Sequence, residues 1–174
     1  MKMRWLSIAL LFGLLLGAVA APVAAGSRTS GLAVPVSGSA TNSQGGVSAF
    51  KGTLTITSFD KQGSSLVVNG VLDGTLSDSS STVIGNIRRF GVSAPENTIR
   101  ASCDRLDMEL YKIEIVSSGF NVKLDPVVVA ISIKDYPNTK LDKLLCNLSK
   151  KLEKNSPAAA IASNLNQILR EIGG

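Results

Sequence analysis

The 174-residue sequence contains no histidine, and aromatic residues make up only 5% of it. Histidine is the commonest general base near neutral pH and the commonest metal ligand in proteins. Its absence excludes Ser/His/Asp and Cys/His catalytic sites and histidine-based zinc sites. Single-strand nucleic-acid binding depends on long basic runs and on aromatic stacking residues, and this sequence has no long basic run and few aromatic residues. We therefore expect no nucleic-acid partner.

Only two cysteines are present, Cys103 and Cys146. They lack the CxxC spacing that is typical of redox and zinc sites, so we predict no metal site there. In an exported chain an even pair most simply forms one disulfide. Such a bridge would close a loop of about 44 residues and stabilise the fold by about 4 kcal/mol on the chain-entropy model.

Paired carboxylates could act in catalysis without histidine. The candidates are Asp104, Asp107, Glu109 and Glu114. Because they alternate with apolar residues, they indicate the solvated face of a strand. Arg88 and Arg89 could hold an anion together, but neighbours on a strand point to opposite faces, so we do not expect a joint site. We predict no catalytic residue, no cofactor and no enzyme activity.

The N-terminus carries the clearest targeting feature. A basic head is followed by an apolar run from Leu6 to Ala20 and then by small residues. This is the layout of a secretory signal peptide. We predict that residues 1–25 are cleaved, after Ala20 or Ala25, and that the protein is secreted or periplasmic. The alternative is an uncleaved anchor, because Trp5–Ala25 is about long enough to span a bilayer.

The remainder of the chain predicts one domain. Removing Lys2 and Arg4 would leave 16 basic residues against 13 acidic ones, a net charge of +3. Residues 26–48 are rich in Gly, Ser, Thr and Asn and predict a flexible leader, in which Pro35 limits 32–36 to an edge strand or to no strand. Residues 49–174 have the size of a single domain, which we expect to be monomeric.

Alternating apolar residues predict a first hairpin with one buried face. They are Phe50, Leu54 and Ile56, then Leu66, Val68, Leu72 and Leu76. Asp60–Gly63 has the composition of a type I turn between the two strands. Residues 82–92 predict a further strand. Residues 93–101 predict a connection, because they contain Pro95 and Asn97.

The segment 106–133 is the most strongly patterned part of the chain. Its apolar residues are Leu106, Met108 and Leu110, then Ile113 and Ile115, then Val122 and Leu124, and finally Val127, Val129 and Ile131. A two-residue turn at Ser118-Gly119 sets every one of them opposite another and pairs Glu114 with Lys123. Both arms shift phase at the same height, so the ribbon is predicted to change the face that it buries, by bending or by passing between sheets. The alternative is that 127–133 is buried on both faces.

Two amphipathic helices end the chain. Their apolar stripes are Leu141, Leu144, Leu145, Leu148 and Leu152, then Ile161, Leu165, Ile168, Leu169 and Ile172. The first helix is basic, with Lys140, Lys143, Lys150, Lys151 and Lys154. With its stripe it could lie weakly on anionic lipid, but we favour packing of the stripe on the sheet, which leaves the lysines in solvent.

These patterns together predict an α+β fold. We expect an antiparallel curved β-sheet or open barrel of about five to seven strands, with two C-terminal amphipathic helices packed on it. The expected function is that of an exported, non-catalytic structural or interaction protein whose partner is unknown. The alternative is an envelope module that binds an apolar or lipid-like ligand between the sheet and the helices, which a cavity of about 300 Å³ or more would favour.

Several segments also resemble a group of small exported bacterial proteins. The segments are Phe50–Phe59 (FKGTLTITSF), Leu66–Leu76 (LVVNGVLDGTL), the Cys103 strand and Leu144–Leu148 (LLCNL). Members of the group pair a GTLTI-type hairpin with a Leu-rich hairpin and an LLC helix, and the resemblance covers residues 32–153. Relatives carry Gly-Pro near Tyr111-Lys112 and are less basic after the second cysteine. The group has no established activity, so the resemblance assigns no functional residue.

Overall fold

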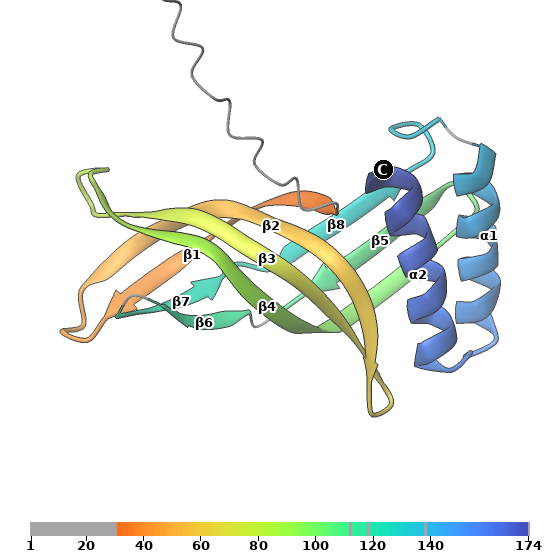
Figure 1. The fold of residues 1–174 in the computed structure, drawn as a ribbon, viewed down its shortest axis with the longest axis horizontal. Helices are drawn as coiled ribbons and strands as arrows, with labels where there is room; N and C mark the ends of the chain where they lie inside the picture. The colour runs from red at the N-terminus through yellow and green to blue at the C-terminus, as the bar shows by residue number, and fades with distance from the viewer. Residues whose placement is uncertain (1–30, 112, 118, 138, 174) are drawn as a thin grey trace, which may run out of the picture.

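The computed structural model describes residues 31–111, 113–117, 119–137 and 139–173 (Figure 1). It has the predicted α+β fold, in which an open, curved antiparallel sheet is followed by two helices that pack against it. The expected signal peptide, residues 1–25, lies outside the described residues and remains a prediction.

The sheet has eight strands in the order β6-β7-β1-β2-β3-β4-β5-β8. The strands are β1 (Leu32–Asn42), β2 (Val47–Gln62), β3 (Ser65–Ser77), β4 (Val83–Ala101), β5 (Arg105–Leu110), β6 (Glu114–Ser117), β7 (Phe120–Leu124) and β8 (Val127–Ser132). The helices are α1 (Thr139–Glu153) and α2 (Ala158–Gly173). The count exceeds five to seven because each arm of the long hairpin is divided at its phase shift.

The predicted register of the long hairpin is confirmed. The observed pairs include Ile115–Val122, Leu110–Val127, Met108–Val129 and Leu106–Ile131. Glu114 pairs with Lys123, and their charged groups lie 3.3 Å apart. Val128 is 57% exposed, so the alternative of a β8 buried on both faces is wrong.

The two phase shifts allow the long hairpin to pair with both β1 and β4. Its outer part pairs through β7 with residues 38–42 of β1, whereas its inner part pairs through β5 with residues 96–101 of β4. β6 and β7 therefore extend the sheet beyond β1, and β5 and β8 extend it beyond β4, so the two parts of the hairpin lie on opposite edges of the eight-stranded sheet. The ribbon passes from one edge to the other at Tyr111 and Pro126.

The N-terminal strand departs from the predicted leader. Instead of a flexible segment with at most a short edge strand, β1 is an 11-residue strand between β7 and β2. Pro35 is tolerated because β1 pairs with β7 only from Gly38 onward, so Pro35 pairs with β2 alone. The missing proline N–H therefore leaves no gap in a ladder.

A similar change of neighbour explains β4, where the predicted connection 93–101 is wrong. The strand runs through Pro95 to Ala101, because β3 pairs with it as far as Pro95 and β5 pairs with it from Glu96. The β2–β3 turn also differs from the prediction. It lies at Gly63-Ser64, two residues beyond the expected position, with Gly63 at a φ of +63°.

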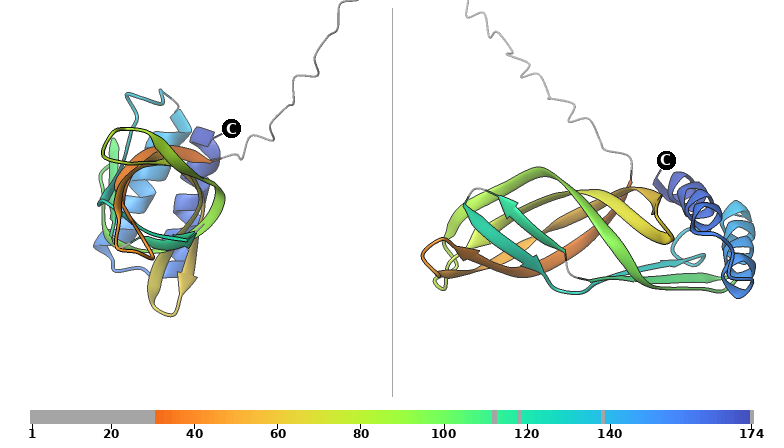
Figure 2. Two further views of the ribbon diagram at one scale, coloured as in Figure 1. Left: turned by 90° about the vertical axis from the view of Figure 1, so that its left-hand side faces the viewer. Right: turned by 90° about the horizontal axis from the view of Figure 1, so that it is seen from below.

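The sheet curls around an apolar interior, and the helices close one end of it (Figure 2). Leu141, Leu145 and Leu148 of α1 are completely buried, which confirms that the stripe packs inward. The side chain of Asn166 in α2 accepts a hydrogen bond from the Phe59 N–H at 2.9 Å and donates to the Phe59 carbonyl at 2.7 Å. β2 continues beyond Ile56, where its pairing with β1 begins, and Asn166 bonds the backbone of this unpaired part of β2 in place of a strand.

Candidate functional site

A cavity of about 630 Å³ lies where the long hairpin changes neighbours. We call it the bend cavity. It is lined by Pro95, Glu96, Tyr111, Ile113, Glu114, Lys123, Leu124 and Pro126. Ile113 and Leu124 are only 4% and 8% exposed and form its apolar floor, whereas Lys123 and Pro126 face outward. The cavity therefore has an exposed rim and a base formed by residues of the core.

Glu96 is the unusual residue of this cavity. It pairs with Leu110, which is fully buried, and it follows the buried residues Val92 and Ala94 at two-residue spacing. Paired residues point to the same side of a sheet, so Glu96 occupies a core-facing position on β4. The side chain is half-buried, and this partial burial raises the pKa of the carboxyl above the ordinary value.

The other polar groups of the bend cavity have partners. The Lys123 ammonium lies 3.3 Å from the Glu114 carboxylate, and both side chains are more than half exposed at the rim. The Tyr111 hydroxyl donates to the Glu109 carboxylate at 2.9 Å, and this hydrogen bond raises the pKa of Tyr111. Among the described residues, no donor or cation engages the Glu96 carboxyl, whose raised pKa is caused by burial alone.

Glu96 also borders a second cavity, of about 300 Å³, beside the start of α2. This cavity is lined by Ser64, Ser65, Leu66, Ile99, Ser156, Ala158 and Ile161 as well as Glu96. A third, of about 420 Å³, lies between α2 and the end of β2 and has charged residues such as Asp60, Lys61 and Arg170 in its lining. The leucine stripe of α1 and the buried face of α2 belong to the apolar core.

The four acidic residues singled out from the sequence are not brought together in a cleft. Asp104 accepts from the Ser102 hydroxyl, which lowers the pKa of Asp104, and Asp107 forms a two-point ion pair with Arg105 at 2.6 and 2.7 Å. Glu109 and Glu114 have the Tyr111 and Lys123 partners described above. Each carboxylate is thus engaged with its own neighbour along the ribbon.

The expectation that Arg88 and Arg89 point to opposite faces is wrong, because both are exposed. The register of β4 against β3 shifts between Ile87 and Phe90, so the two arginines form a bulge opposite Asp73. Arg89 adopts a φ of +49°, and its N–H donates to the Asp73 carboxylate at 2.8 Å. Neither arginine lines the bend cavity or the cavities beside α1 and α2.

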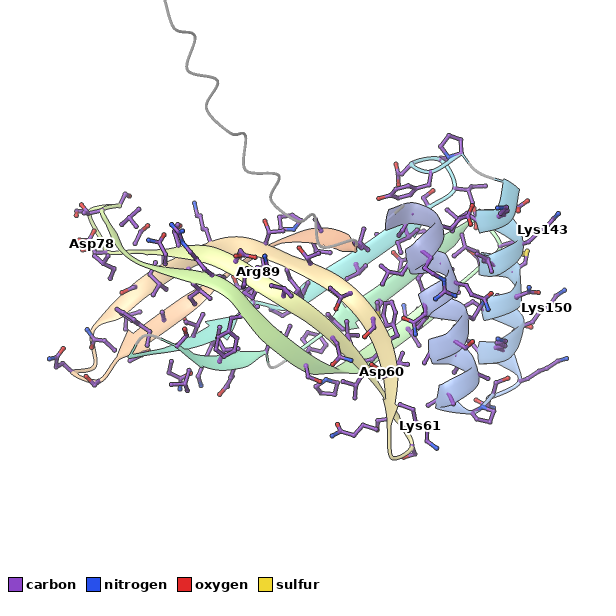
Figure 3. All side chains as sticks on the ribbon, in the orientation of Figure 1. Asp60, Lys61, Asp78, Arg89, Lys143 and Lys150 are labelled. Atoms are coloured by element: carbon purple, nitrogen blue, oxygen red, sulfur yellow. A yellow bond between two sulfur atoms is a disulfide. The ribbon has the colours of Figure 1, made fainter. Side chains whose placement is uncertain are left out.

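The outer surface of the helices is basic (Figure 3). Lys143 and Lys150 of α1 are exposed, whereas the Lys151 ammonium donates to the Ala160 carbonyl at 3.0 Å and joins the two helices. A groove of about 380 Å³ between α1 and α2 is lined by Lys140, Lys143, Leu144, Gln167, Arg170 and Glu171. Since the apolar stripe of α1 faces inward, any contact of this surface with lipid would be electrostatic.

The opposite end of the sheet is nearly uncharged. We call it the hairpin end, where the β1–β2, β3–β4 and β6–β7 turns lie (Figure 2). Four of the exposed large aliphatic residues belong to it: Val47, Val83, Ile84 and Val116. Asp78 is the charged residue of the β3–β4 turn, and its carboxylate accepts from the N–H groups of Ser80 and Thr82 at 2.9 Å each.

Side-chain hydrogen bonds hold two turns of the hairpin end in place. The Asn42 side chain accepts from the N–H groups of Gln44 and Gly46 at 3.0 and 2.7 Å, which fixes the β1–β2 turn as Asp78 fixes the β3–β4 turn. Strand pairing sets Val116 opposite Asn121, Asn121 opposite Thr41 and Thr41 opposite Val47. These exposed side chains therefore form one outward row across four strands.

Cys103 and Cys146 form the predicted disulfide, which joins the β4–β5 connection to α1. This bond fits an oxidising environment outside the cytoplasm. Within the part of the chain that the structure describes, no helix has both the length and the hydropathy needed to cross a bilayer. The same residues contain no group of three or more Cys, Asp or Glu side chains placed to hold a metal ion.

Comparisons with known proteins found no family model, no curated protein and no solved structure that matches the chain. The resemblance to small exported bacterial proteins therefore remains a prediction. Sequence reasoning did not find Glu96, because it placed this residue in a connection. The signal was the two-residue spacing of Val92, Ala94 and Glu96, which continues past Pro95, where the strand was expected to have ended.

Proposed function

We propose that the protein is an exported, non-catalytic interaction protein that docks on another protein through its hairpin end. The observation that carries this proposal is the gathering of exposed aliphatic side chains on one nearly uncharged end, where Val47 and Val116 are 71% and 72% exposed. Single exposed apolar residues are ordinary, but a group of them on one surface is typical of an interaction site.

The architecture supports this role in two further ways. The turns at the hairpin end are fixed by Asn42 and Asp78, so docking there would cost little ordering of the chain. The disulfide fits the oxidising compartment that export would lead to. A surface whose turns are held by side-chain hydrogen bonds suits recognition.

A triple variant tests the proposal: Val47→Ser, Val83→Ser and Val116→Ser. The matched control is Val128→Ser, because Val128 is 57% exposed on β8, away from the hairpin turns. Chemical crosslinking in the native extracellular or envelope fraction, read by mass spectrometry, should give a defined adduct that the triple variant loses and the control keeps. Identical adducts for the wild type and the triple variant would refute docking at this end.

A second function is binding of a small apolar ligand, and the bend cavity favours it. Its volume of about 630 Å³ falls within the range of about 300–1,000 Å³ that is usual for ligand sites. The cavity lies at the bend of the hairpin, whereas the sequence led us to expect a ligand between sheet and helices. Native mass spectrometry of protein purified from its own source tests this function, since a retained small molecule should appear as a defined mass increment.

A further inference from the structure

We propose that the bend cavity binds a small amphiphilic amine, with its ammonium group at the Glu96 carboxylate and its apolar chain on Ile113 and Leu124. This inference rests on the second function proposed above and adds the chemical class of the ligand. It is independent of docking at the hairpin end.

The cavity is a built feature of the fold. The β3–β4 ladder ends at Pro95, and the β4–β5 ladder begins at Glu96. Beside these residues the long hairpin bends, between its β5–β8 pair and its β6–β7 pair. Pro95 and Pro126 have fixed φ angles and no N–H group, so these two walls are stiff and bring no unpaired backbone donor. A preformed cavity binds without the entropy cost of ordering its walls.

The floor of the cavity suits an alkyl chain. Ile113 and Leu124 belong to the apolar core, and their facing backbones are joined by a hydrogen bond of 3.0 Å from the Leu124 N–H to the Ile113 carbonyl. An apolar chain that covered them would remove water from surface that already borders the core. This contact selects for apolar character but not for the charge of a headgroup.

The expected charge of the ligand's headgroup follows from which polar side chains of the bend cavity lack a partner. Lys123 and Glu114 neutralise each other at the rim, and Tyr111 donates to Glu109, so these three side chains already have partners. The Glu96 carboxyl occupies a core-facing position without a donor among the described residues. A half-buried carboxylate such as this one is stabilised by a cation that also donates hydrogen bonds, which an ammonium group does.

The position of Glu96 between two cavities fits an elongated ligand. The second cavity, about 300 Å³ beside the start of α2, contributes the hydroxyl groups of serine residues on the other side of Glu96. An amine whose chain lay in the bend cavity could direct its remaining N–H groups toward this side. The arrangement predicts a primary amine in preference to a quaternary ammonium, which has no N–H to donate.

The test uses three probes of equal chain length: octylamine, octan-1-ol and octanoate. Each is titrated into the oxidised protein and followed by backbone amide NMR shifts and by calorimetry. We expect octylamine to bind at least about tenfold more tightly than octan-1-ol, the gain of one charged hydrogen bond. The shifts should centre on residues 95–96, 113 and 122–124. Octan-1-ol binding without a preference for the amine would overturn the amine assignment and leave the apolar-ligand function intact.

Two nearly isosteric variants separate Glu96 from a general effect of charge. Glu96→Gln should lower octylamine affinity by about tenfold and leave octan-1-ol affinity unchanged. Glu114→Gln removes the same charge from the same cavity, but from a group paired with Lys123, so it should lower octylamine affinity less than about threefold. Equal losses in the two variants, or tighter binding of octanoate than of octylamine, would overturn the proposal.

Discussion

Removal of the disulfide should weaken the fold by an amount that follows from its position in the chain. Cys103 and Cys146 are separated by 43 positions, so the bond closes a loop of about 44 residues in the unfolded chain. The chain-entropy relation then gives a stabilisation of about 4 kcal/mol at 25 °C. The variant to make is Cys103→Ser with Cys146→Ser, which removes both thiols and prevents mixed disulfides.

The variant should still fold, because the bond is not the main attachment of α1. Leu141, Leu145 and Leu148 are fully buried, and burial of each leucine contributes about 1.5–3 kcal/mol. The apolar stripe therefore contributes as much as the covalent link or more. Far-UV circular dichroism should show the same helix and strand content for the variant and the wild type.

Urea unfolding followed by circular dichroism measures the loss. With a denaturant slope of about 2 kcal/mol/M, a loss of 4 kcal/mol moves the midpoint down by about 2 M. Wild-type protein in reductant should match the double variant, and reductant should leave the variant unchanged. A difference below about 1 kcal/mol between the oxidised wild type and the variant would contradict the entropic account.

Three further predictions follow from single residues. Burial raises the pKa of Glu96, so the native state holds a proton that the unfolded chain releases once the pH exceeds 4.5. The free energy of unfolding that Glu96 contributes is therefore largest at acid pH and is lost as the pH rises through the pKa of the folded state. In urea titrations at a series of pH values, Glu96→Gln should reduce this loss. An unchanged dependence of stability on pH would refute the prediction. Gly74→Ala would place a methyl group 2.5 Å from the Phe50 ring and should lower the free energy of unfolding by about 1–3 kcal/mol in urea titrations. Gly91→Ala, whose methyl group would have no atom within 4 Å, should leave this free energy unchanged or raise it. Asn164 is 2% exposed, and its side-chain oxygen has no partner among the described residues, so Asn164→Leu should raise the free energy of unfolding by about 1–3 kcal/mol, and a loss would show that the oxygen is satisfied.

The long hairpin was predictable because three independent patterns agreed on one register. Apolar residues met apolar residues, Glu114 met Lys123, and a glycine stood at the turn, where Gly119 has a φ of +81°. A shift of one residue would have put every apolar side chain on the wrong face, so few alternatives competed. The disulfide followed for a similar reason, since two cysteines allow only one intramolecular pair.

Most errors concern places where a strand changes its neighbour or its register. Pro35 and Pro95 were expected to limit strands, and each lies instead where its strand pairs on one side only. Arg88 and Arg89 were expected on opposite faces, and a bulge puts both outside. Periodicity within a single segment cannot show these features, because they depend on which strand lies alongside.

The bend cavity follows from this same exchange of neighbours. When the hairpin leaves β4 to join β1, the strands separate, and side chains must close the opening between them. Ile113 and Leu124 close it from the core side, but the facing position on β4 carries Glu96, where an apolar residue would complete the wall. Because Glu96 is half-buried, a leucine at this position would add apolar burial and remove the cost of the partly desolvated carboxyl. Glu96 is therefore poorly explained by stability alone, and this is the physical reason to seek its role in binding.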